Sequence, residues 1–94
     1  MHRRVTALPR DCTIHEAENL KALLLELMDD PGLVSIDIQA VERIDTPTLQ
    51  LLATFVLDRS AHGRGVAWFG TSRVFLDTAR RLGLDSALGL ERLI

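Results

Sequence analysis

A threonine hydroxyl lies beside a carboxylate at Asp45-Thr46, directly before Pro47. The stretch 36–49 runs from an apolar strand, through a polar hinge, into the start of an apolar helix. This order predicts Thr46 as the N-cap and Pro47 as the first helical residue, where a missing N–H costs nothing. A plain cap is the simpler interpretation of Thr46. The chemistry that its hydroxyl offers is phosphorylation, because a phosphate there would lie at the positive end of the helix dipole and would repel an acidic partner.

Other residues that often catalyse reactions lack the necessary spacing. The turn at 63–65 has neither the further glycine of a dinucleotide-binding loop nor the Gly-Lys-Ser/Thr of a P-loop. Glu42 and Asp45 lie in the hinge and are not paired on a helix, so they make only a remote acid/base pair. A hydrolytic triad has no elbow motif and would have to be assembled from unrelated positions, namely Ser72, Asp77 and His62. We therefore expect no enzyme.

The composition also disfavours metals, cofactors and nucleic acid. Cys12 is the single cysteine, and no His accompanies it at ligand spacing. The net charge is −2 and aromatic residues make up 4% of the chain, so there is neither a basic surface nor a base-stacking platform. The three histidines are isolated in sequence and are interpreted as surface residues: His2, His15 and His62.

Length and hydropathy predict one domain spanning 1–94. Ninety-four residues form a core but not two domains. No stretch approaches the roughly 20 apolar residues that span a bilayer, so we expect no membrane insertion. The first residues are not followed by the apolar region of a secretory signal, and this favours the cytoplasm.

The pattern of apolar residues predicts alternating strands and helices. Residues 5–8 form an edge strand that Pro9 ends. Thr13 and Glu16 have the spacing of a capping box for a helix over 14–28. A strand at 33–38 leads to the hinge, and a helix follows over 47–61.

Three further elements are expected after that helix. The apolar run 66–69 is typical of a strand buried on both faces, and Ser72 is placed to cap a third helix with Phe75, Ala79 and Leu82 on its buried face. In the tail, four residues are expected to seal the sheet: Leu88, Leu90, Leu93 and Ile94. Strands separated by helices imply parallel pairing, so we expect an α/β fold with a sheet of about four mainly parallel strands and helices on one face.

The helix over 47–61 has more apolar residues than one sheet contact needs. One broad face, expected to pack on the sheet, carries Leu49, Leu52, Ala53, Val56 and Leu57. Thr48, Leu51, Phe55 and His62 fall on another face. Leu51 and Phe55 either contact a neighbouring helix or form part of a surface for a partner, and both alternatives remain open.

The hinge and its flanks resemble a known family. Residues 34–52 look like the core of the STAS domain, the fold of bacterial anti-sigma factor antagonists, and the similarity extends across nearly the whole chain. In that family the residue after the hinge Asp is the Ser or Thr that a partner serine kinase phosphorylates, and here it is Thr46. This chain departs from the usual pattern, because Pro47 and Thr48 stand where a small residue and glycine are common.

The resemblance implies a non-catalytic regulatory module that binds another protein. Its partner is expected to be a serine kinase or anti-sigma factor, or a kinase of chemotaxis or two-component signalling. Members with Asp-Thr at the hinge also include the small subunit of a lipid-trafficking ABC transporter, bound to its ATPase. A weaker alternative is a small-ligand sensor. The expected partner surface consists of Asp45, Thr46, Thr48, Leu51 and Phe55.

Overall fold

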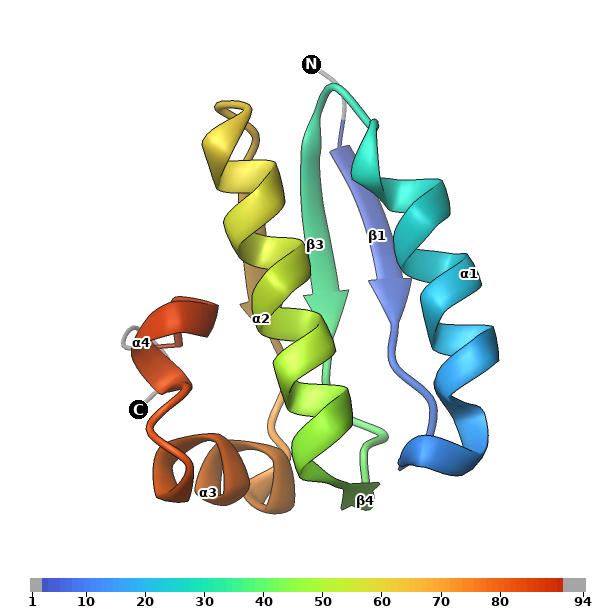
Figure 1. The fold of residues 1–94 in the computed structure, drawn as a ribbon, viewed down its shortest axis with the longest axis vertical. Helices are drawn as coiled ribbons and strands as arrows, with labels where there is room; N and C mark the ends of the chain where they lie inside the picture. The colour runs from blue at the N-terminus through green and yellow to red at the C-terminus, as the bar shows by residue number, and fades with distance from the viewer. Residues whose placement is uncertain (1–2, 91–94) are drawn as a thin grey trace.

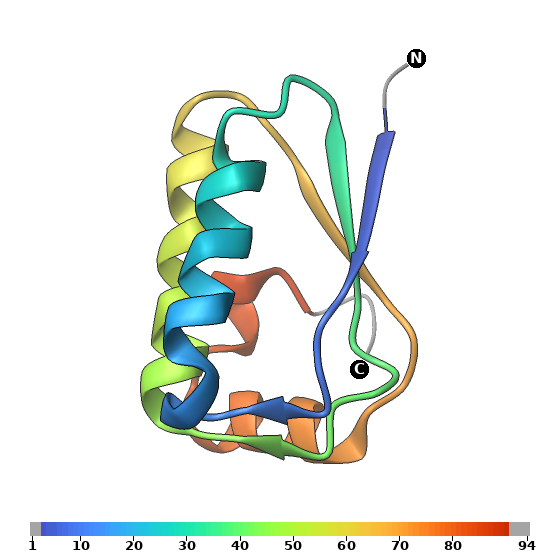
Figure 2. The same cartoon turned by 90° about the vertical axis from the view of Figure 1, so that its right-hand side faces the viewer.

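A computed structural model describes residues 3–90, without the side chain of Arg3. Three parallel strands form a sheet in the order β1 (Arg3–Ala7), β3 (Leu33–Asp37) and β5 (Val66–Phe69). Two long helices, α1 (Ala17–Met28) and α2 (Thr46–Ala61), lie side by side on one face of this sheet (Figures 1 and 2). The parallel α/β architecture with helices on one face is therefore confirmed.

The remaining strands form a separate pair at the hinge end. β2 (Asp11–Cys12) and β4 (Arg43–Ile44) pair in parallel and cross below the starts of the two long helices (Figure 2). The expected sheet of four strands is thus divided into three strands and a short pair. The chain turns out of the sheet after β1, where Pro9 has no N–H to continue the ladder.

The entry into α1 differs from the predicted capping box. A 3₁₀ turn, η1 (Ile14–Glu16), precedes the α-helix, and its flanking residue Thr13 makes no side-chain cap. The Thr13 hydroxyl instead donates a hydrogen bond to Asp11 Oδ1. The predicted capping by Thr13 was therefore wrong, because in the 3₁₀ turn the Glu16 N–H donates to the backbone carbonyl of Thr13 at 2.9 Å rather than to its hydroxyl.

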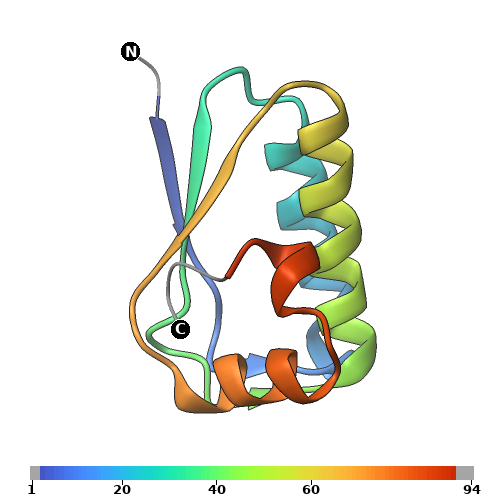
Figure 3. The same ribbon diagram turned by 90° about the vertical axis from the view of Figure 1, so that its left-hand side faces the viewer.

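The C-terminal part adds α3 (Arg73–Arg81) and α4 (Asp85–Leu88), which lie beside the hinge-end half of α2 (Figure 3). The Ser72 hydroxyl accepts from Phe75 N at 3.2 Å and donates to Val41 O at 2.8 Å, so the predicted cap is confirmed. Leu82 is exposed rather than part of the buried face. In the tail Leu88 and Leu90 are buried, whereas Leu93 and Ile94 lie outside the described residues.

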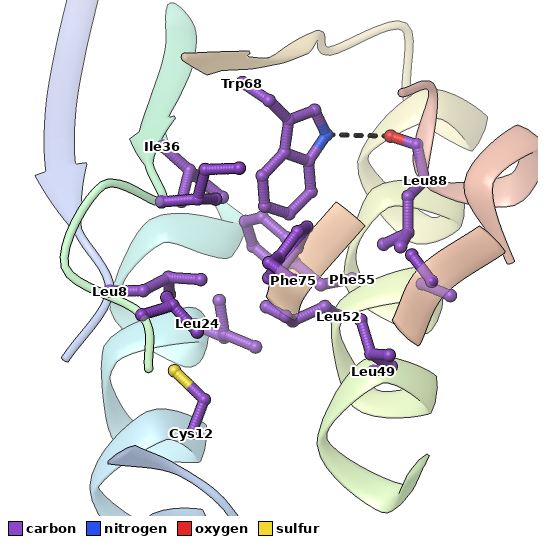
Figure 4. Packing of buried hydrophobic residues seen from close by; sticks show 14 of the residues in the cluster. Leu8, Cys12, Leu24, Ile36, Leu49, Leu52, Phe55, Trp68, Phe75 and Leu88 are labelled. Atoms are coloured by element: carbon purple, nitrogen blue, oxygen red, sulfur yellow. Dashed lines mark hydrogen bonds between the residues drawn. The ribbon is translucent and has the colours of Figure 1, made fainter. Parts of the chain in front are cut away.

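The core fills the space between the sheet and the helices (Figure 4). Val34 and Ile36 point into it from β3, and Trp68 joins them from β5, where its indole donates to Leu88 O at 2.7 Å. The expectation that β5 is buried on both faces was wrong. Phe69 is exposed, because the helices cover only one side of the sheet.

The buried face of α2 is broader than the sequence indicates. Its buried residues are Thr48, Leu49, Leu52, Ala53, Phe55 and Arg59. Val56 is half-buried and Leu57 is 58% exposed, so Leu57 was wrongly assigned to the sheet contact. The helix contacts α1 as well as the sheet, and this rotates its buried face toward Phe55.

Arg59 is a fully buried arginine near the end of α2. Its guanidinium donates to backbone carbonyl oxygens of five residues: Leu27, Met28, Asp30, Gly32 and Gly65. Burial lowers the pKa of Arg59, while the nearby Asp30 carboxylate opposes that effect. The side chain thus joins the end of α1, the turn before β3 and the start of β5.

Among the described residues, no helix has both the length and the apolar character to cross a membrane.

Candidate functional site

Asp45 holds the starts of two helical segments together. Its Oδ1 accepts from Thr48 N at 3.1 Å and its Oδ2 accepts from Ile14 N at 2.8 Å. One carboxylate therefore caps α2 and also binds the 3₁₀ turn that leads into α1. Asp45, and not Thr46, is the N-cap of α2, because only a carboxylate offers two acceptor oxygens to two segments at once.

The ionised form of Asp45 is favoured by these contacts. Burial raises the pKa of Asp45, but hydrogen bonds from Thr48 and Ile14 outweigh burial and hold the pKa below its ordinary value. A carboxylate whose pKa is depressed in the folded state stabilises the fold above its unfolded pKa. This contribution is lost as the pH falls through the folded pKa.

A graded series at position 45 checks this double role. Asp45→Ala removes both acceptors, so we expect it to lower the free energy of unfolding by about 2 kcal/mol, the sum of two typical cap losses. Asp45→Asn keeps one acceptor oxygen and should lose about half as much. Urea unfolding at pH 7 measures both losses. Equal losses for the two variants would contradict the double cap.

The pH dependence of the same series gives an independent check. The stability difference between the native protein and Asp45→Asn should be constant near pH 7 and should shrink as the pH falls below the ordinary Asp pKa of about 3.9, where the unfolded chain binds a proton before the folded one does. Unfolding curves between pH 3 and pH 7 measure it. A difference that grows on acidification would contradict the assignment.

Thr46 is the first residue of α2, and its side chain is exposed. Within residues 3–90, no hydrogen bond of its hydroxyl is found. The sequence pattern predicted that this hydroxyl caps the helix, but in the structure Asp45 is the cap instead. Because Asp45 takes that role, the Thr46 hydroxyl projects from the protein at a helix start without a structural function.

The remaining residues of the expected partner surface lie elsewhere. Thr48 is 3% exposed and Phe55 is 2% exposed, so neither side chain forms part of the exposed surface at the hinge. Phe55 belongs to the core, where it lies near Leu52 (Figure 4). The expectation that these two side chains form an exposed stripe was wrong, since α1 packs against that side of α2. Leu51 is half-buried and remains accessible.

Residues from the segment before η1 also border the hinge, and the sequence did not single them out. Arg10 Nε forms an ion pair with Glu42, and the backbone carbonyl of Arg10 accepts from the N–H groups of Glu42 and Arg43. No local pattern signals this contact, because its partners are 32 and 33 positions apart in the sequence. The exposed hinge surface therefore includes charges of both signs.

Side-chain hydrogen bonds connect the segments that follow the carboxyl ends of β3 and β5. Asp37 Oδ1 accepts from Gln39 N at 2.8 Å, and Gln39 Oε1 accepts from Thr71 N at 2.9 Å. A side chain at Gly70 would place its Cβ 2.4 Å from Asp37 Oδ1, and the φ of Gly70 is +86°, so this close approach requires glycine. Among the described residues, no cluster of three or more His, Cys, Asp or Glu is arranged to hold a metal ion.

Comparisons with known proteins agree with this architecture. The crystal structure of a sulfate transporter family protein from Wolinella succinogenes has a similar fold, with a TM-score of 0.77 and 22% identity. The match covers 96% of this chain and 74% of that one. No curated protein sequence matches this chain significantly. A family model described as "Mlab, STAS domain" matches residues 5–93. The resemblance of the hinge region to STAS domains is thereby confirmed, and the chain belongs to the Mlab-type STAS domain family.

Proposed function

We propose that the chain is a non-catalytic regulatory module that docks a protein partner at the hinge end of α2, and that phosphorylation of Thr46 controls this contact. The supporting observation is the exposed Thr46 hydroxyl, which the fold does not use because Asp45 caps the helix. Membership of the STAS family supports a binding role rather than catalysis. The fitting partner is a serine kinase or anti-sigma factor, or a kinase of a signalling system.

A phosphate at Thr46 would act on the complex more than on the fold. It would add a charge of about −1.5 to −2 beside the Asp45 carboxylate, and the helix dipole would partly offset the resulting repulsion. An exposed first helical residue tolerates this group without repacking. A partner pressed against the hinge would have to desolvate the phosphate, so the cost would fall on binding.

Two substitutions at Thr46 test the switch. Thr46→Ala should change the free energy of unfolding by less than about 0.5 kcal/mol, since no cap is lost, and should leave partner affinity nearly unchanged. Thr46→Glu places a carboxylate near the phosphate position and should weaken the complex by about ten-fold, or about 1.4 kcal/mol. Calorimetry against a partner obtained by pull-down measures both. Equal affinities of the three forms would exclude the switch.

The second candidate is the STAS subunit of a lipid-trafficking ABC transporter, bound to its ATPase. The family description, which names Mlab, and the Asp45-Thr46 pair at the hinge favour it. In this role the hinge surface holds the ATPase constitutively, and Thr46 is never modified. Intact mass of the protein purified from its host distinguishes the candidates, because phosphorylation adds about 80 Da only in the first.

A further inference from the structure

A groove runs between α1 and α2 on the outer surface of the helical layer. One hollow of about 480 Å³ lies between the starts of the two helices, and a second of about 310 Å³ lies farther along them. Lys21, Leu51 and Thr54 border both hollows, so the two form one continuous feature, here called the α1–α2 groove. The helices lie side by side and both begin at the hinge end (Figure 1).

The rim of the groove exposes apolar side chains that the fold does not bury. Ile14 borders the first hollow and is 65% exposed, and Leu25 borders the second and is 71% exposed. Leu51 is half-buried between them, and Phe55 contributes to the second hollow from below. Two large aliphatic side chains on the same groove favour a binding surface, because covering them would remove apolar area from water.

The charges along the groove indicate what covers it. Lys21, the single lysine of the chain, stands at the centre and makes no ion pair with any residue in 3–90. Glu18 borders only the first hollow and Asp58 only the second. A second copy related by a two-fold axis through the groove centre would bring two Lys21 ammonium groups together. The charge pattern therefore favours a different chain with a carboxylate at this point.

We infer that the α1–α2 groove binds an amphipathic helix of a partner protein, with a carboxylate over Lys21 and a basic side chain over Asp58. Lys21 lies at the level of Leu51 and Thr54, and Asp58 follows these by four to seven residues along α2. At 1.5 Å per residue this is about 6 to 10 Å, which equals one to two turns of a helix lying along the groove. Apolar residues between the two charges would contact Leu25 and Leu51, as in other helix-in-groove complexes. The first hollow reaches Pro47 at the hinge end, but Lys21, Leu25 and Asp58 border the second hollow, which Thr46 does not border.

A displayed peptide library tests the inference. The probe is a set of 15-residue helical peptides with a fixed apolar face and randomised polar positions, selected on the native protein. We expect the bound peptides to be enriched in Asp or Glu at a central position and in Lys or Arg one to two turns away. The selected peptides are then measured by fluorescence anisotropy against Lys21→Glu, Leu25→Ser and Leu57→Ser. The last is a matched control, because Leu57 is an exposed leucine of α2 that borders neither hollow.

The expected result is a loss of about ten-fold or more with Lys21→Glu and with Leu25→Ser, and no change with Leu57→Ser. A peptide whose acidic residue is replaced by lysine should recover affinity for Lys21→Glu, and this recovery separates charge pairing from altered folding. Thr46→Glu should leave peptide affinity unchanged, so failure here is distinguishable from failure of the hinge proposal. The inference is overturned if no peptide is enriched, if the charge swap gives no recovery, or if the protein self-associates through this face in sedimentation experiments.

Discussion

Arg59→Met is expected to lower the free energy of unfolding by about 3 to 5 kcal/mol, because backbone carbonyl oxygens that the guanidinium serves would lose a donor at about 1 to 3 kcal/mol for each buried acceptor left unsatisfied. Methionine occupies much of the same volume but donates no hydrogen bond. The carbonyl oxygens of Leu27, Asp30 and Gly32, with which the guanidinium bonds at 2.7 to 2.9 Å, would lose this donor. The Leu27 oxygen keeps the backbone N–H of Asp30 at 3.2 Å, so most of the cost falls on the other carbonyls, and relaxation and water recover part of it.

Urea unfolding measures this loss, with Arg80→Met as the matched control. Arg80 is an exposed arginine in the last turn of α3, so its replacement should change stability by less than about 0.5 kcal/mol. If Arg59→Met unfolds at the same urea concentration as Arg80→Met, the carbonyl contacts do not stabilise the fold, and that part of the account is wrong.

Phe55→Ala is expected to destabilise the fold by about 3 to 5 kcal/mol, the usual cost of removing a buried phenylalanine. The ring is 2% exposed and packs in the core between α2 and its neighbours. The sequence pattern had left two alternatives for Phe55, a contact with a neighbouring helix and a place on the partner surface, and the burial of the ring favours the first. Because the ring is buried, its replacement is expected to affect the fold first.

Leu57→Ala is the control for this variant, because Leu57 lies on the same helix and is 58% exposed. We expect it to change the free energy of unfolding by less than about 0.5 kcal/mol. Thermal melts followed by circular dichroism compare the two variants. A mild effect of Phe55→Ala together with a large effect of Leu57→Ala would mean that α2 is rotated relative to the structure described here.

The helix cap shows how far local sequence predicts the site. Asp45 and Thr46 are adjacent, both are good capping residues, and proline is tolerated in either of the first two helical positions, so the sequence places the helix start only to within one residue. That single residue decides whether the Thr46 hydroxyl is occupied or free. Asp45 rather than Thr46 caps the helix, and its carboxylate also accepts a hydrogen bond from Ile14. Local sequence patterns cannot predict this contact, because Ile14 is 31 positions away.

The order of strands and helices was predictable because apolar periodicity and turn residues mark each element. The face that α2 buries was not predictable. The helix contacts both a sheet and another helix, so its apolar residues are distributed around much of its circumference and their periodicity does not define one buried face. Arg59 was missed for a related reason. A charged residue in the last turn of a helix is usually exposed, and its acceptors are backbone carbonyls, of which the farthest belongs to Leu27, 32 positions away.

The central claim, that a protein partner docks at the hinge, is tested most directly by site-specific photo-crosslinking in the host cell. A photoreactive amino acid replaces Arg43, which is exposed in the hinge, or in the control Arg80, which is exposed on α3. We predict that one protein is crosslinked from position 43, that the same protein is not crosslinked from position 80, and that Thr46→Glu reduces the product at position 43. Equal crosslinking from both positions, or crosslinking from position 80 alone, would contradict the account.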